Sequence, residues 1–324
     1  MLRLLVPTGS GYQWIEHAPP APFPGEFLWA DLFEPTVEEE KAVEALLTVD
    51  VPTRDEMKEI ETSNRLYEEN GAVYMTATVG TRLDTGTPGS SPITFILADG
   101  RLITNRYADP MPVHRFMSHV VRSPAACTSA PTLLAGLLEA FVERIADVLE
   151  KVQLELDAVS LAIFPRSQDV SADSHDLQAM IHKIGANGDL ISKSRESLVS
   201  FQRLLVYVQQ STNVTLSQDQ KGRFKSAMRD VQSLSDHASF LSGKVSFLLD
   251  AVLGLINLQQ NNIIKIFSVA AVMFLPPTLV ASIYGMNFHH MPELDRAWGY
   301  PLALLAMLAS AVIPYLYFKR KGWL

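Results

Sequence analysis

The C-terminal part of the chain carries a row of polar and small residues whose spacing suits the wall of a water-filled path. Alternating steps of four and three residues give the row Asp250, Gly254, Asn257, Asn261, Ile264, Ser268, Ala271, Leu275, Thr278, Ser282 and Gly285. A 3.5-residue repeat keeps such a row on one face of a helix that packs beside other helices. Two interpretations fit equally well. Several copies around an axis would line a water-filled path with the row, or its small residues only let helices approach closely.

A short hydrophilic turn, IYGMNFHHMPEL, follows the row and separates two strongly apolar segments. It holds Gly285, Met286 and Asn287, and the role of these residues depends on what the two flanking segments are. Its paired histidines, His289 and His290, have the chemistry of transition-metal ligands, although exposed loop histidines are usually only solvated.

The two apolar segments have the length that a bilayer requires. Residues 263–284 carry one charge, Lys265, and residues 298–318 form a second span, so residues 285–297 are the loop of a helical hairpin. Lys319, Arg320 and Lys321 follow in the short tail 319–324, and the positive-inside rule puts them in the cytoplasm. We therefore expect both chain ends to lie inside, with the long N-terminal part in the cytosol.

Residues 1–130 predict a cytosolic α/β domain with a partly antiparallel sheet. A strand is expected over 27–33, and two capping boxes, Thr36 with Glu39 and Thr53 with Glu56, each predict the start of a helix. Asn70-Gly71 precedes a strand over 72–79, and Asp99-Gly100 joins strands 93–97 and 102–105 into a hairpin. The Pro- and Ser-containing stretch 123–131 marks the boundary.

Residues 131–262 predict a cytosolic helical region. Apolar residues recur there at three- and four-residue steps, as one buried helix face requires: Leu134, Leu138, Phe141, Ile145, Val148, Val152 and Leu156. A second helix is expected over 175–210, and the polar stretch 211–217 interrupts it. From residue 218 helical spacing continues to residue 284, which predicts one stalk helix roughly 100 Å long at about 1.5 Å per residue.

Composition excludes several classes of function. A net charge of −8 argues against nucleic-acid binding and suits acidic groups that face a cation. The lone Cys127 permits no disulfide within the chain. No phosphate-binding loop, dinucleotide fingerprint, nucleophile motif or metal-ligand cluster occurs, so no enzyme and no cofactor is expected. A membrane-anchored cytosolic sensor without transport remains an alternative.

Several stretches are more specific than composition. They are TLVASIYGMNF followed by MPEL, the preceding IIKIFSV and FLPP, the ending YLYFKRKGWL and, more weakly, FLWADLFEP and PTRDEMKEIE. Together they resemble the CorA family of magnesium channels, especially its proteobacterial members. Gly-Met-Asn alone is a weak motif, but its place after the first of two C-terminal spans, with MPEL behind it, is a strong one.

The resemblance implies an architecture and a function. It implies a homopentamer in the inner membrane, with a cytosolic α/β domain, a stalk helix continuous with the pore-lining first span, and an outer ring of second spans. The expected function is passive transport of Mg²⁺, with Co²⁺ and Ni²⁺ as further ions. The implied partners are further copies of the chain, membrane lipid and divalent cations.

The resemblance also makes Gly285, Met286 and Asn287 the selectivity filter. Mg²⁺ gives up its water shell reluctantly, so a ring of neutral Asn287 amides would hydrogen-bond the waters of the incoming ion. In this interpretation Gly285 allows a tight turn and Met286 packs behind it. Glu293 and Asp295 would raise the local cation concentration, although a plain solvated loop is as good an interpretation of Asp295.

The resemblance also implies pore-lining roles lower in the pore. Asp250, Asn261 and Thr278 supply polar positions, and the apolar Ile264 and Leu275 form constrictions that stop ions by dewetting. The family also places an apolar pore residue at Phe267, whereas the 3.5-residue row puts Ser268 there. Asp250 has a second interpretation as a plain surface charge of the stalk.

Finally, the resemblance suggests that internal Mg²⁺ closes the channel as a regulatory ligand. Acidic domains around an axis repel each other, and cations that bridge their carboxylates would hold a closed arrangement. The candidate regulatory carboxylates on the stalk are Asp230 and Asp236, which could equally be solvated surface charges. A zinc-transporting branch of the same superfamily is the nearer alternative, but the row offers zinc no sulfur or nitrogen ligand.

Overall fold

The structure, a computed structural model, describes residues 1–9, 11–124, 128–165, 174–287, 289, 291–292 and 296–322, and only the backbone of residues 174–176. It forms two compact units, Met1–Leu249 and Asp250–Leu324, of which each is described by itself. The domain boundaries expected at residues 130 and 262 fall at the start of α4 (Ala130–Ile163) and inside α6 (Gln218–Tyr284), and they stay predictions.

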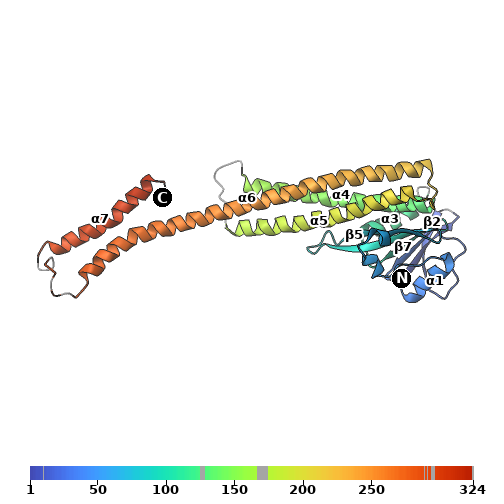
Figure 1. The fold of residues 1–324 in the computed structure, drawn as a ribbon, viewed down its shortest axis with the longest axis horizontal. Helices are drawn as coiled ribbons and strands as arrows, with labels where there is room; N and C mark the ends of the chain where they lie inside the picture. The colour runs from blue at the N-terminus through green and yellow to red at the C-terminus, as the bar shows by residue number, and fades with distance from the viewer. Residues whose placement is uncertain are drawn as a thin grey trace. The chain divides into compact units, whose positions relative to one another are not determined.

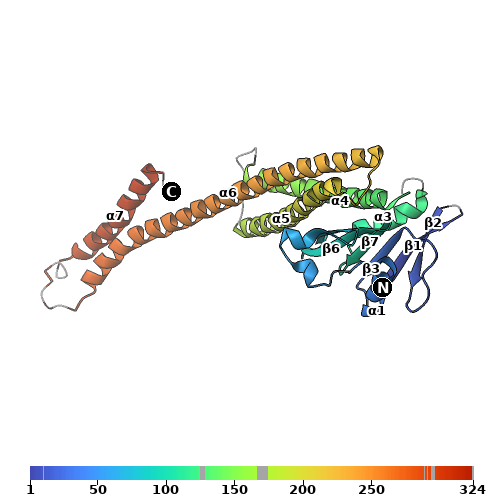
Figure 2. The same ribbon diagram turned by 45° about the vertical axis from the view of Figure 1, so that its right-hand side comes forward.

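The first unit is built on a seven-stranded mixed sheet, shown in Figures 1 and 2, with strand order β2-β1-β3-β7-β6-β5-β4. Its strands are β1 (Leu2–Thr8), β2 (Gly11–His17), β3 (Trp29–Phe33), β4 (Leu66–Glu69), β5 (Ala72–Thr81), β6 (Gly89–Ala98) and β7 (Arg101–Arg106). Only the central pair β3–β7 is parallel, and every other neighbouring pair is antiparallel. The predicted α/β class with a partly antiparallel sheet is therefore confirmed.

Two tight turns fix the register of the antiparallel strands. Asn70-Gly71 joins β4 to β5, and Asp99-Gly100 joins β6 to β7. All four residues have positive φ, between 47° and 80°, the conformation that two-residue hairpin turns require and that Asn, Asp and Gly tolerate. Both predicted turns are confirmed.

The two predicted capping boxes behave differently. Thr36 and Glu39 cap each other reciprocally and open α1 (Val37–Leu47), as predicted. Thr53 and Glu56 make the same contacts, but the element that starts there is the short 3-10 turn η1 (Glu56–Lys58) and not an α-helix, so this prediction is wrong. A longer helix would have no face to bury, because Met57 is buried whereas Ile60 is 88% exposed.

The sheet of the first unit lies between two layers of helices (Figure 2). On one face α1 packs on a cluster that includes Leu4, Ala30 and Tyr74. On the other face lie α3 (Met111–Arg122), α4 (Ala130–Ile163) and α5 (Ser174–Gln210). A further short helix, α2 (Thr62–Arg65), leads into β4.

Helices α4 and α5 match the sequence predictions closely. Every residue of the predicted apolar row of α4, from Leu134 to Leu156, is buried. Two serines tie α5 to β5: the backbone N–H of Gly80 donates to Ser197 Oγ at 2.8 Å, and that of Thr78 to Ser200 Oγ at 3.1 Å. Because β4 pairs only with the first part of β5, these hydroxyls satisfy backbone donors that lack a strand partner.

Helix α6 (Gln218–Tyr284) begins after the polar stretch 211–217, as predicted. Ser217 and Gln220 cap its start reciprocally, with Ser217 Oγ accepting from the Gln220 N–H at 3.2 Å. In the first unit, Arg223 pairs with Glu139 of α4 through two contacts of 3.0 and 2.5 Å, and Lys244 pairs with Asp157. In each helix the residue of the second pair follows that of the first toward the C-terminus. Helices α4 and α6 therefore run parallel.

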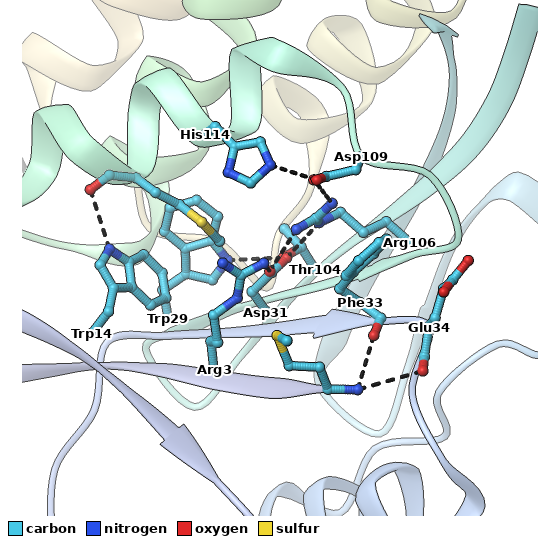
Figure 3. A network of polar contacts seen from close by, with 12 residues as sticks. Arg3, Trp14, Trp29, Asp31, Phe33, Glu34, Thr104, Arg106, Asp109 and His114 are labelled. Atoms are coloured by element: carbon cyan, nitrogen blue, oxygen red, sulfur yellow. Dashed lines mark hydrogen bonds and ion pairs between the residues drawn. The ribbon is translucent and has the colours of Figure 1, made fainter. Parts of the chain in front are cut away.

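A buried ionic network, which no local sequence pattern indicated, joins the two halves of the sheet (Figure 3). Arg106 of β7 and Asp31 of β3, both fully buried, form a bidentate pair at 2.9 Å for each contact. Thr104 Oγ1 donates to Asp31 at 2.8 Å, and Arg3 of β1 lies 3.5 Å from the same carboxylate. Such a pair is costly to break from one side, since the remaining charge stays buried.

The network continues to the start of α3. Arg106 Nη1 also donates to Asp109 at 2.6 Å, and His114 Nε2 lies 2.5 Å from the other oxygen of that carboxylate. Burial alone would raise the pKa of Asp109, but the hydrogen bonds from His114 and Arg106 hold it below the usual aspartate value. The network therefore stabilises the fold at neutral pH and loses part of that contribution as the pH falls through the lowered Asp109 pKa.

Candidate ion pore

The second unit consists of the end of α6 and of α7 (Gly299–Arg320). Within the described residues, α6 and α7 are the two helices long and apolar enough to cross a membrane. Helix α6 runs unbroken through Pro276 and Pro277. Because proline has no N–H, the carbonyls of Val272 and Met273 lose their backbone donors there, which a membrane helix tolerates where neighbours supply other partners.

One face of the end of α6 lies against α7. Val269 is only 2% exposed, and Met273, Pro276 and Val280, which follow it at steps of four, three and four, are partly covered. On α7, Gly299 and Ala303 are buried. Figures 1 and 2 show α7 running back beside the end of α6. We call these covered residues the seam of the hairpin, since small residues four apart allow two membrane helices to pack together.

The polar row lies on the opposite face of the helix. Each of its residues from Asp250 to Gly285 is exposed in the single chain. Its members between Ala271 and Ser282 each follow a residue of the covered seam by two positions, and two positions correspond to about 200° around a helix. Helix α7 therefore leaves the row free for water or for other copies of the chain.

The predicted pore-lining residues Asp250, Asn261, Ile264, Leu275 and Thr278 all lie on this exposed row. Their assignment to a pore remains a prediction, because a pore needs further copies. Phe267 and Ser268 are both exposed as well, so a single chain does not decide which of them would face a path.

Thr278 shows a useful orientation of its hydroxyl. Its Oγ1 donates to the carbonyl of Phe274 at 2.7 Å. Because the hydroxyl hydrogen is engaged within the helix, the oxygen presents its lone pairs outward. A hydroxyl held in this way is suited to accept hydrogen bonds from the waters of a hydrated cation.

The predicted filter residues, Gly285, Met286 and Asn287, lie directly after the last turn of α6. The N–H of Gly285 donates to Ala281 O at 2.9 Å, and that of Met286 to Ile283 O at 3.3 Å. A Cβ on Gly285 would lie 3.1 Å from Ala281 O, so a close backbone approach favours glycine there. Met286 and Asn287 are exposed in the single chain, and the packing of Met286 behind the turn stays a prediction.

Several loop predictions lie outside the described residues. Glu293, Asp295 and His290 are among the residues whose structure is not described, whereas His289 is exposed. The cation-attracting role of the two acids therefore stays a prediction.

The two candidate regulatory carboxylates are exposed on the part of α6 in the first unit. Asp236 accepts a hydrogen bond from Gln232 Nε2 at 3.1 Å. Within the described ranges, no group of three or more His, Cys, Asp or Glu side chains is placed to hold a metal ion. The regulatory role of Asp230 and Asp236 therefore stays a prediction.

Sequence reasoning missed the seam that seats α7 on α6. A signal for it was present: Gly299 and Ala303 stand four residues apart at the start of the second span, the spacing of small residues at membrane helix contacts. The polar row by itself says nothing about the opposite face of α6, which therefore stayed unassigned.

Comparison with known proteins gives the chain a family. The sequence model of the family described as "CorA-like Mg2+ transporter protein" matches residues 24–320. The chain belongs to this family. Three similar relatives are each named "Magnesium transport protein CorA". The protein from Yersinia pseudotuberculosis is 38% identical, and those from Haemophilus influenzae and Salmonella typhimurium are 37% identical, over 92% of both chains in every case.

Solved structures agree on the fold. The complete CorA magnesium transporter of Methanocaldococcus jannaschii superposes with a TM-score of 0.79 over 100% of this chain and 99% of its own, at 18% identity. The full-length CmaX protein gives 0.68 over 100% and 98%, at 16% identity. The predicted resemblance to the CorA family is thus confirmed, as is the arrangement of an α/β part, a long helix and two C-terminal apolar helices.

Proposed function

We propose that this chain is a Mg²⁺ channel of the plasma membrane, assembled from several copies around the polar row of α6. The observation that supports it most is the row itself. It is exposed along its whole length, lies opposite the α7 seam and ends at Gly285, directly before Met286 and Asn287. A membrane helix pair has no reason to leave such a face toward lipid, whereas a ring of copies turns it toward water.

The driving force in this proposal is the membrane potential. A divalent ion gains about 4.6 kcal/mol per 100 mV of inside-negative potential, twice the figure for a single charge. Passive entry through a pore therefore needs no nucleotide and no catalysis. The pentameric state, the inward position of both chain ends and the conduction of Co²⁺ and Ni²⁺ belong to the proposal.

The deciding experiment is ion uptake into proteoliposomes under an imposed potential, with Mg²⁺, Co²⁺, Ni²⁺ and Zn²⁺ compared. Uptake of Mg²⁺ that follows the potential is expected. Selective uptake of Zn²⁺ would support the zinc-transporting alternative, and no divalent flux at all would support a membrane-anchored sensor.

The apolar positions of the row give a prediction about leak. Replacing Leu275 or Ile264 by serine should raise Mg²⁺ efflux from loaded proteoliposomes several-fold, because a polar side chain eases wetting of a dry constriction. Ile266→Ser is the matched control, since Ile266 is equally exposed but lies about 180° around the helix from Leu275. An unchanged leak in both row variants would place the barrier elsewhere.

Closure by internal Mg²⁺ is the regulatory part of the proposal. Millimolar Mg²⁺ should protect the purified oligomer from limited proteolysis and inhibit flux over the same concentration range. Asp236→Asn should weaken both effects, whereas Asp219→Asn, at an exposed acid of the first turn of α6, should not. Because coupling between two sites is reciprocal, the protection from proteolysis and the inhibition of flux must change together. Flux indifferent to internal Mg²⁺ would refute this regulation.

A further inference from the structure

An open cavity of about 920 Å³ lies between α3 and α4 in the first unit. At one end of it the ring of Phe116 presses on α4 at Gly136, where a Cβ would come within 2.5 Å of the ring. Arg223, which pairs with Glu139, adds a contact from the start of α6. A cavity of this volume has the size of sites that take a small organic ligand.

Helix α3 brings basic side chains to this cavity. Its sequence, MPVHRFMSHVVR, contains no acid, although the whole chain has a net charge of −8. Arg115, His119 and Arg122 line the cavity and are exposed. They follow one another at steps of four and three, so they form one stripe of the helix, about 10 Å long at about 1.5 Å per residue. We call these three residues the basic stripe.

The basic stripe is not neutralised within the part of the chain that the structure describes. There Arg115 makes no hydrogen bond or ion pair, and Arg122 donates to the carbonyl of Ser118 at 3.2 Å. His119 stacks on the ring of Phe116 at 6.3 Å. Guanidinium groups bind phosphate through paired hydrogen bonds. Since the stripe is longer than one phosphate group requires, it fits phosphates joined in a row.

The wall that α4 contributes carries acidic side chains. Glu143 and Asp147 line the cavity about one helical turn apart, and both are exposed. Among the described residues Glu143 has no ion-pair partner, and Asp147 lies 3.9 Å from Arg144, which also pairs with Asp84. These carboxylates would repel a bare phosphate. Mg²⁺, however, is usually held by one or two carboxylates together with phosphate oxygens.

We propose that this cavity binds the Mg²⁺ complex of a nucleoside di- or triphosphate. The phosphates contact the basic stripe, the Mg²⁺ contacts Glu143 and Asp147, and the nucleoside fills the remaining volume beside Phe116. Within the described residues no group of three or more His, Cys, Asp or Glu could hold a metal ion, so the phosphates supply the further oxygen ligands. Recognition by side chains needs no phosphate-binding loop, and the inference does not depend on the proposed channel function.

Isothermal titration calorimetry of the full-length oligomer in detergent tests the basic stripe, with ATP as the probe at constant free Mg²⁺. Saturable binding is expected. Arg115→Gln combined with Arg122→Gln should weaken it at least about tenfold, because charge-assisted hydrogen bonds are lost. Arg195→Gln combined with Arg203→Gln removes the same charge from exposed positions of α5 outside the cavity and should leave the affinity unchanged. No binding of millimolar ATP to the wild type, or an equal loss in both double variants, would overturn the proposal.

The Mg²⁺ contact has a test of its own. Glu143→Gln should weaken the binding of ATP in Mg²⁺ but strengthen it in excess EDTA, because a carboxylate attracts the bound cation and repels bare phosphates. Glu150→Gln, at an exposed acid of α4 outside the cavity, should change neither affinity. An effect of Glu143→Gln that is absent or has the same sign in both conditions would overturn the placement of Mg²⁺.

Pyrophosphate separates the two parts of the ligand. It carries linked phosphates without a nucleoside, so it should bind more weakly than ATP and should still lose affinity in the variant that lacks Arg115 and Arg122. Equal affinities for pyrophosphate and ATP would overturn the placement of the nucleoside in the cavity.

Discussion

Replacing Asn287 by alanine should abolish Mg²⁺ uptake while the assembled oligomer stays intact. The amide is proposed to hold the waters of the incoming ion, and each hydrogen bond of this kind contributes about 0.5–1.5 kcal/mol. Because one substitution removes the amide from every copy, a loss of several kcal/mol is expected, which corresponds to a fall in uptake of at least about a hundredfold. The measurement is the initial rate of uptake into proteoliposomes at equal protein content.

The matched control is Asn262→Ala. Asn262 is an exposed asparagine of α6 that lies off the polar row, so its loss should leave uptake close to that of the wild type. Size-exclusion chromatography in detergent should give the same oligomer for both variants. Normal flux through Asn287→Ala would remove the filter assignment, even if the polar row lines the path.

A second large effect is expected in the first unit, at Asp31. Among the described residues, Asp31→Ala leaves the fully buried guanidinium of Arg106 with only Asp109 as an acidic partner. Removing one member of a buried pair costs about 3–5 kcal/mol. For a unit of this size that lowers the melting temperature by about 6–20 °C. Thermal unfolding of the full-length protein in detergent, followed by circular dichroism, measures the shift.

Two further variants separate the buried charge from a general effect of substitution. Asp55→Ala removes an exposed pair with Lys58 and should leave the melting temperature unchanged. Asp31→Leu combined with Arg106→Met removes both charges and should recover much of the stability lost in Asp31→Ala. A double variant no more stable than Asp31→Ala would show that the pair has a role beyond mutual neutralisation.

Local signals in the sequence predicted much of the fold. The turns at Asn70-Gly71 and Asp99-Gly100 require positive φ, and their residue types show this directly. The apolar row of α4 has a helical period, and the interruption before α6 is polar. Each of these features can be recognised from a short stretch of sequence. The failure at Glu56 has the same origin: the capping contacts formed, but the length of a helix beyond its cap depends on a face to bury. The residues after Glu56 do not supply one.

Features that depend on distant residues were not predictable in this way. Asp31 and Arg106 are 75 residues apart, and only the pairing of β3 with β7 brings them together. The residues of the candidate pore are a middle case. Their common face on α6 followed from spacing, but their function came from resemblance, since a path at an axis depends on copies that one chain does not contain.

The parallel pairing of β3 with β7 also constrains the order in which the protein can fold during synthesis. Strands β1, β2 and β3 pair locally, as do β5, β6 and β7, but the two groups meet only after β7 has been made. At about 5–20 residues per second, the 75 residues between Asp31 and Arg106 take about 4–15 s to appear. During that interval the edge of β3 that will pair with β7 has no strand partner and is open to incorrect pairing.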